Sequence, residues 1–279
     1  MASEYRYDHF TRRQLEDDRA FHAGTEPGWS MPDFDLPTVS GGRVRKGDFL
    51  GRRPVLFTTA SLTDPMAASA ALPLRRLHRE FGEDVAFITV YVREAHPGER
   101  IPQPATMEWK MRHARMLRER DAIAWTVAVD DLDGSFHRAL GGNSNAAYLM
   151  DPNGNVAFRT LWSNDERVLR GALEAIAHGP PGHPFERERL VVPMARGLAR
   201  ADDVVRTAGR SAVDDFRRAA PLVFAAAEAA WVWRTLTPLG RAVVAGAGVL
   251  VAAGLWGGVR LLARPSRRHR PLRAGGALL

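Results

Sequence analysis

Cysteine is absent from this chain of 279 residues. Its absence excludes disulfide bonds, thiolate nucleophiles, zinc–thiolate sites and cysteine-ligated iron–sulfur clusters. Lysine is almost as scarce, because Lys46 and Lys110 are the only two among 39 basic residues. Charged residues make up 25% of the chain and hydrophobic residues 45%, so the composition is that of a folded protein and excludes wholesale disorder.

Acidic residues are missing from the C-terminal region. From Arg241 onward the chain has seven arginines and no Asp or Glu, whereas residues 1–240 carry 32 basic and 32 acidic side chains. The formal net charge of +7 therefore belongs to the tail alone. A neutral main part argues against a nucleic-acid-binding fold, which needs an excess of basic residues on one face.

Long uncharged runs are also rare. The first twenty residues contain acids throughout and no apolar stretch of signal-peptide length. The run 242–259 has no charge, and its eighteen residues span roughly 27 Å as a helix. Extended to 242–263 past the snorkelling Arg260, it is long enough for a membrane helix, with a buried soluble helix as the alternative. We expect membrane lipid as its partner, with residues 264–279 as an Arg-rich tail.

The topology of this anchor leaves two alternatives. A cytoplasmic main domain is expected because no export signal precedes it, yet a single span would then carry the arginine tail across the membrane. In a hairpin, 221–237 enters as a shallow arm and 242–263 returns. Gly254 and Gly258 form one GxxxG pattern, which chance explains in a run this rich in glycine, with a helix-mediated dimer as the alternative.

The rest of the chain divides by composition. Residues 1–30 are polar with a short helical pattern, 31–178 alternate between strand-like and helix-like runs, and GPPGHP breaks the chain at 179–184. The segment 179–220 is charged and Ala-rich, typical of an amphipathic juxtamembrane helix or a plain linker helix. Residues 221–263 form the predicted membrane-associated segment.

Within 31–178 the elements have a regular order. The pattern predicts, in sequence, a hairpin over 31–51, a buried strand at 54–60, a helix at 64–81, a strand at 85–92, a helix at 106–120, a strand at 124–129, a short helix at 132–140, a hairpin over 146–162 and a helix at 166–177. Continuous apolar strands alternating with helices indicate an α/β fold with buried parallel strands.

This order resembles the thioredoxin superfamily, with a peroxiredoxin-like character. That superfamily places its redox residue in the loop between the first buried strand and its helix, here 58–70. A helix N-terminus stabilises an anion there through its dipole and free N–H groups.

Two motifs narrow the resemblance. Ser61-Leu62-Thr63-Asp64-Pro65 and the sequence YVREAH at 91–96 resemble the iodothyronine deiodinases and their bacterial deiodinase-like relatives. That family carries a Ser-x-Thr-(Cys or selenocysteine)-Pro loop and a Tyr-x-x-Glu-Ala-His motif. The resemblance covers roughly residues 8–178 and implies an oxidoreductase whose nucleophile occupies the position of Asp64.

Asp64 is the departure from that pattern. A carboxylate cannot form the sulfenyl or selenenyl species that the family's turnover requires, and no cysteine elsewhere replaces it. Read from its neighbours alone, Asp followed by Pro at a helix start is an N-cap followed by the first helical residue. The functional alternatives for Asp64 are a general base and an acceptor that holds a cationic ligand.

The other candidate site residues follow from position and resemblance. Glu94 and His96 fall at the carboxyl end of a strand, where open α/β sheets place their sites, and the resemblance gives them a role in shaping the catalytic cleft. The alternative is a plain loop in which Glu94 pairs with Arg93 or Arg100. Ser61, Thr63 and Asn145 complete the predicted binding cleft, and Asn145 stands near where the superfamily usually has a cis-proline. Histidines show no metal-ligand spacing, so no metal and no cofactor are predicted.

Three functions remain open at this point. The favoured one is a membrane-anchored, non-redox binding or regulatory domain that recognises a small molecule or a protein. The second is an oxidoreductase that positions an external thiol, as the resemblance implies. The third is a hydrolase or lyase that uses Asp64 with His96, which requires these two side chains to lie within reach of each other.

Overall fold

The apolar runs of the sequence form one five-stranded sheet in the computed structural model, which describes residues 5–178, 191–232, 236–237, 239–240, 242–243 and 246–248. The strands are β3 (Val55–Ala60), β4 (Ala86–Tyr91), β5 (Thr126–Val129), β6 (Ala147–Met150) and β7 (Val156–Thr160), in the spatial order β5-β4-β3-β6-β7. The first three are parallel, and β6 and β7 are antiparallel to their neighbours. This is a thioredoxin-like α/β fold, and the predicted fold class is confirmed to that extent.

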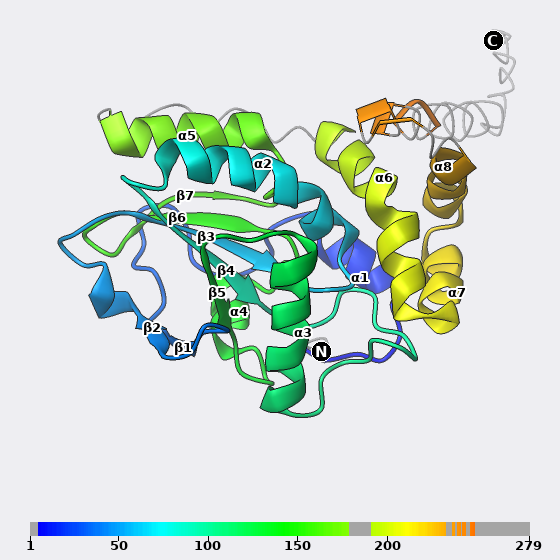
Figure 1. Ribbon diagram of the computed structural model, residues 1–279, viewed down its shortest axis with the longest axis horizontal. Coiled ribbons are helices and arrows are strands. Elements are labelled where there is room, and N and C mark those ends of the chain that lie inside the picture. Colours follow the sequence, from blue (N-terminus) through cyan, green and yellow to red (C-terminus); the bar gives the residue numbers. More distant parts are fainter. Residues whose placement is uncertain are drawn as a thin grey trace, which may run out of the picture.

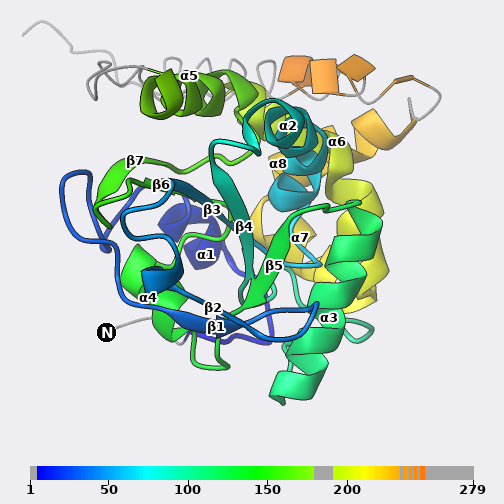
Figure 2. The same ribbon diagram turned by 60° about the vertical axis from the view of Figure 1, so that its left-hand side comes forward.

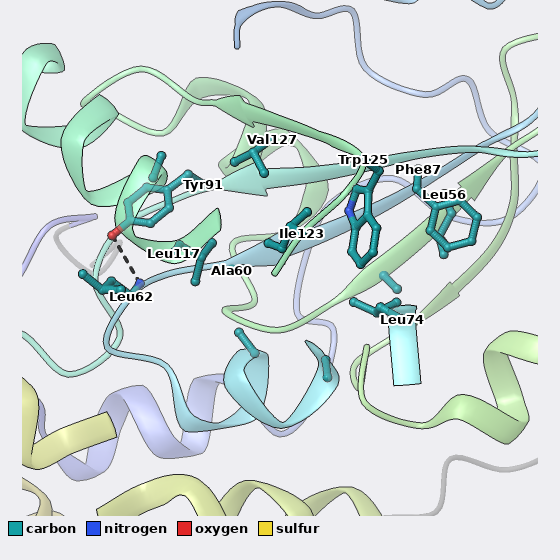
Figure 3. Packing of buried hydrophobic residues seen from close by; sticks show 14 of the residues in the cluster. Leu56, Ala60, Leu62, Leu74, Phe87, Tyr91, Leu117, Ile123, Trp125 and Val127 are labelled. Carbon is teal, nitrogen blue, oxygen red and sulfur yellow. Dashed lines mark hydrogen bonds between the residues drawn. The ribbon is translucent and has the colours of Figure 1, made fainter. Parts of the chain in front are cut away.

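Alternation along the strands divides their side chains between two cores. On one face Leu56, Phe87 and Leu149 meet helices α2 (Pro65–Phe81), α3 (Met107–Arg120) and α5 (Glu166–His178). Figure 3 shows part of this core, where the Tyr91 hydroxyl group also accepts a hydrogen bond from the backbone N–H of Leu62. The helices predicted from the sequence are therefore present. Three of them, α2, α3 and α5, cover this face of the sheet, and the candidate loop leads from β3 into α2.

The opposite face of the sheet has a different cover. Phe57, Ile88 and Tyr148 pack there against helix α4 (Ser135–Leu140) and against the hairpin of β1 (Asp35–Pro37) and β2 (Arg43–Arg45), which leads into the 3-10 turn η1 (Lys46–Asp48). Figure 2 shows this hairpin and α4 on the side of the sheet away from α2. The short N-terminal helix α1 (Arg12–Asp17) has no buried residue, as its polar pattern predicts.

Three further helices follow α5 and pack on the same side as α2. They are α6 (Val191–Ala208), α7 (Arg210–Ala219) and α8 (Pro221–Val232). Helix α6 lies beside α2, and α7 and α8 lie against α6 (Figure 1). Leu198, Val205 and Phe216 of these helices are buried in the core of the α2 face.

This packing differs from the expectation for 179–220. A linker or juxtamembrane helix would leave its apolar face to a membrane or to solvent, whereas α6 and α7 bury that face on the sheet domain. Helix α8 likewise contacts α6 and α7, and Glu228 pairs with Arg206 at 2.6 Å. The apolar segment at 221–232 is thus a cover of the fold, and the predicted domain boundaries stay a prediction.

Most of the predicted membrane helix at 242–263 lies outside the described residues, as do Gly254, Gly258 and the Arg-rich tail. None of the helices in the described part of the chain is both long and apolar enough to cross a bilayer.

Candidate functional site

Asp64 begins helix α2 as the sequence predicts. Its backbone is extended, its Oδ1 atom accepts a hydrogen bond of 2.8 Å from the N–H of Met66, and Pro65 is the first helical residue. This arrangement satisfies one of the free N–H groups that every helix N-terminus presents. The side chain is almost completely buried, with an exposed fraction of 3%. Asp64 therefore stands where thioredoxin-like proteins present a reactive residue, but it is covered.

Glu94 lies in the next loop, after β4, and is fully buried. Its Oε2 atom accepts hydrogen bonds from the Thr63 N–H at 3.1 Å and the Thr63 hydroxyl group at 2.8 Å. Its Oε1 atom accepts from the Tyr91 hydroxyl group and contacts His113 Nδ1 at 3.0 Å. Neither Arg93 nor Arg100 forms the ion pair proposed from the sequence, and Glu94 instead joins three elements.

The two loops are held together by further hydrogen bonds. The Ser61 hydroxyl group accepts from the Ala95 N–H, and the Thr63 hydroxyl group accepts from the His96 N–H, each at 3.1 Å. The buried side chains of Ser61 and Thr63 thus link the loops that follow β3 and β4. These hydrogen bonds fix the backbone at Thr63, Ala95 and His96. They therefore also position Asp64, which follows Thr63 in the chain.

A cavity of about 120 Å³ lies beside Asp64. His96 and Asn145 also line it, so the structure brings together three of the six predicted site residues, whereas Ser61, Thr63 and Glu94 are not part of its wall. Most of the wall is apolar and includes Phe10, Trp162 and residues of α6, α7 and α8. The site is therefore a mostly apolar cavity with a few polar groups, partly open to solvent.

Four of the polar residues in the cavity wall each have one unsatisfied atom. Within the described residues, the buried atoms without a hydrogen-bond partner at this cavity are Asp64 Oδ2, His96 Nδ1, Asn143 Oδ1 and Asn145 Nδ2. Buried polar atoms are normally paired, because leaving one unpaired costs about 1–3 kcal/mol. Their concentration around one cavity marks it as the place where a bound molecule would find partners.

Burial also sets the protonation of this site. It raises the pKa of Asp64 to about 7, and the nearby Asp18 carboxylate acts in the same direction. It lowers the pKa of His96 to about 3, so the imidazole, packed between Phe10 and Phe216, is neutral at physiological pH. The site thus pairs a neutral imidazole with a carboxyl group that titrates near neutrality.

Asp18 is a site residue that the sequence did not reveal. It lines the cavity from the end of α1, and its carboxylate accepts hydrogen bonds from the Ser144 N–H at 3.1 Å and hydroxyl group at 3.0 Å. Burial raises its pKa as well. Its partner lies 126 residues away in the chain, and no local pattern connects the two. Asn145 is anchored next to this pair through Ser163, whose hydroxyl group donates to its Oδ1 at 2.5 Å.

The covering helices are fastened to the site loops. Gly197 of α6 lies so close to Met66 that a Cβ atom there would fall 2.0 Å from the Met66 sulfur. Glu99, in the loop after β4, accepts hydrogen bonds from the Ser211 hydroxyl group and from the N–H groups of Arg210 and Ser211 at the start of α7, which lowers its pKa to about 2. Helices α6 and α7 are thus seated on the N-terminus of α2 and on the loop of His96.

Comparison with known proteins supports the resemblance carried by the two motifs. The chain is 30% identical to thyroxine 5-deiodinase of Gallus gallus over 141 residues, which cover 47% of this chain and 54% of that protein. It is 27% identical over 175 residues to type II iodothyronine deiodinase of Neoceratodus forsteri, with 57% and 61% covered. The chain spans little more than half the length of these relatives. The predicted similarity to iodothyronine deiodinases is confirmed, whereas no protein-family model matches the chain.

The solved structures with a similar fold include a thiol:disulfide interchange protein and a peroxidoxin. A thiol:disulfide interchange protein DsbE from Chlorobium tepidum is 18% identical, with a TM-score of 0.45 and coverage of 55% of this chain and 99% of that one. Peroxidoxin BcpB from Mycobacterium tuberculosis is 17% identical, with a TM-score of 0.42 and coverage of 55% and 96%. The fold is assigned from the strand order of the sheet and not from these similarities.

Proposed function

We propose that this deiodinase-like, thioredoxin-fold protein is a binding or regulatory domain without thiol or selenol turnover. The observation that carries the proposal is Asp64 itself, at the N-cap where the family has its nucleophile, in a chain with no cysteine. A carboxylate in this place binds ligands through charge and hydrogen bonds but cannot cycle through a sulfenyl or selenenyl state.

The small volume of the cavity supports binding over turnover of a large substrate. Its volume of about 120 Å³ is below that of an engineered 150 Å³ cavity that holds one benzene molecule. A molecule with two linked aromatic rings is larger than this volume. The small volume and the unsatisfied polar atoms favour a small ligand held by Asp64, His96 and Asn145.

Thiol-dependent activity tests this proposal. We expect the wild-type chain to show no dithiothreitol-dependent peroxide reduction and no deiodination above a heat-inactivated control. Asp64→Cys provides the matched positive variant, because a cysteine at a helix N-terminus has a lowered thiol pKa and regains reactivity with a thiol-labelling reagent. Turnover by the wild-type chain would overturn the proposal.

A hydrolase or lyase is the second candidate, since Asp64 and His96 line one cavity and the pKa of Asp64, about 7, suits a general base at neutral pH. No hydrogen bond joins the two side chains in the described structure. Release of p-nitrophenol from p-nitrophenyl acetate that Asp64→Asn abolishes would favour this candidate over pure binding.

The membrane anchor is also part of the proposal. The uncharged run 242–259 and the arginines that follow it support insertion of 242–263, with the main domain in the cytoplasm. With α8 packed against α6 and α7, the anchor depends on 242–263 alone. The full chain should sediment with phospholipid vesicles and resist alkaline carbonate extraction. Recovery in the supernatant would contradict the anchor without affecting the binding role.

A further inference from the structure

The polar groups in the wall of the cavity beside Asp64 are mostly of one kind. Its carboxyl groups, Asp64 and Asp18, cap the start of α2 and the end of α1, and its imidazole, His96, is kept neutral by burial. Among the described residues that line it, Arg19 is the only permanent cation, and this side chain is exposed. Helices α6, α7 and α8 contribute apolar residues alone. Hydrogen-bond acceptors and negative charge therefore dominate the polar part of the wall.

The apolar part of the wall is partly aromatic. Phe10, Trp162 and Phe216 line the cavity, and Phe10 and Phe216 flank His96 with ring centroids 4.1 and 5.4 Å from the imidazole. Aromatic faces attract cations through their quadrupole, most strongly where water is excluded. Aromatic rings next to a buried carboxyl group with a free oxygen form an environment that suits a positively charged group on a short apolar stem.

We propose that this cavity binds a small primary alkylammonium ion, whose N–H groups donate to Asp64 Oδ2 and whose alkyl part lies against the aromatic wall. The inference rests on the proposed binding function and names the class of its ligand. The volume of about 120 Å³ limits the ligand to about six non-hydrogen atoms. His96 Nδ1, an acceptor in the neutral tautomer protonated at Nε2, provides a second site for an ammonium hydrogen.

Charge coupling gives this binding a pH dependence. The ammonium ion stabilises the ionised form of Asp64, so binding strengthens as the pH rises through about 7. The other charged groups that act on Asp64 are Asp18, which raises its pKa, and Arg120, which lowers it. His96 stays neutral over this range, and α6, α7 and α8 present no charge to the cavity. An alkylamine remains protonated throughout, as a lysine side chain does.

The experiment uses three probes of similar size and different charge. The full chain is titrated at pH 8 with n-butylamine, 1-butanol and butyrate, with binding followed by calorimetry and by the rise of Tm with ligand concentration. We expect n-butylamine to raise Tm and to bind at least tenfold more tightly than 1-butanol, and butyrate to bind more weakly still. Equal binding of n-butylamine and 1-butanol would overturn the inference.

Asp64→Asn is the decisive variant, because Asn also caps a helix and the domain should remain folded. We expect it to weaken n-butylamine at least tenfold and to leave 1-butanol unchanged. Asp33→Asn is the matched control, since it removes a carboxylate with an exposed fraction of 94% and should bind n-butylamine like the wild type. Unchanged binding by Asp64→Asn would overturn the inference.

The outcome is separable from that of the proposed function. Thiol-dependent turnover by the wild-type chain would overturn the proposed function whether or not amines bind. Absence of both turnover and amine binding would overturn the ligand class alone.

Discussion

The loops that follow β3 and β4 each bury one carboxyl group, and the two groups have opposite surroundings. Glu94 has protein partners at both oxygens, from Thr63, Tyr91 and His113. Asp64 has a partner at Oδ1 alone, and its Oδ2 lies unpaired beside a cavity. Both residues belong to motifs that resemble the deiodinases, yet one joins the protein together while the other remains available to a ligand.

The difference separates structural from functional use of a buried charge. A carboxylate satisfied on all sides rigidifies its neighbours and has no capacity left for a ligand. A half-satisfied carboxyl group costs stability in the free protein, and proteins retain such strain at functional sites. In the proposed function Glu94 is therefore a positioning residue, and Asp64 is the group that meets the ligand.

The largest expected effect is on Glu94. Glu94→Ala leaves the donors of Thr63 and Tyr91 buried without an acceptor, so we expect the free energy of unfolding to fall by about 3–5 kcal/mol in urea denaturation. Glu94→Gln keeps one carbonyl oxygen and should lose less. Glu108→Ala, an exposed carboxylate on α3, is the matched control and should change stability by less than about 0.5 kcal/mol. A loss below 1 kcal/mol for Glu94→Ala would show that the network is not structural.

The sequence predicts the surroundings of Asp64 more fully than those of Glu94, and the reason is physical. An N-cap followed by proline is a local signal, and the strands and helices around it follow from apolar periodicity. The partners of Glu94 are long-range: Thr63 lies 31 residues away, and His113 lies 19 residues away. The position of Glu94 in its motif therefore predicts a residue of the cleft, whereas in the structure Glu94 joins three elements.

The cover over the site escaped prediction for the same reason. Helices α6–α8 carry apolar faces that the sequence reveals, but the same pattern suits a membrane surface, a linker or a protein core. The close approach of Gly197 to Met66, which lies more than a hundred residues earlier, decides between these in the structure. Asp18, paired with Ser144, belongs to the same class of long-range contact.

The second prediction concerns the pH dependence of stability at Asp64. The pKa of this group is about 7 in the folded protein and about 3.9 when unfolded, so the folded state binds more protons between these values. Its contribution to stability is present below about pH 4 and is lost as the pH rises through about 7. Relative to Asp64→Asn, the wild-type free energy of unfolding should fall by about 1.4 kcal/mol per pH unit in this window.

Taking the difference between the two proteins isolates Asp64. The pKa of His96, lowered to about 3 by burial, produces a slope of opposite sign, but it does so in both proteins and cancels. Urea denaturation at half-unit steps from pH 4 to pH 8 provides the measurement. Parallel stability curves for wild type and Asp64→Asn would mean that Asp64 is ionised throughout, like an exposed carboxylate.

The smallest effect concerns the cap itself. Asn and Ala at position 64 are both uncharged, but only Asn accepts a hydrogen bond from the Met66 N–H, so Asp64→Asn should be more stable than Asp64→Ala by about 0.5–2 kcal/mol at any pH. Thr106, whose hydroxyl group accepts from the Trp109 N–H at the exposed start of α3, provides the matched pair Thr106→Asn and Thr106→Ala. We expect a similar difference at both positions, because one capping hydrogen bond is lost in each. Equal stability of the two position-64 variants, with a normal difference at position 106, would show that the loop network around Glu94 holds the start of α2 without help from the cap.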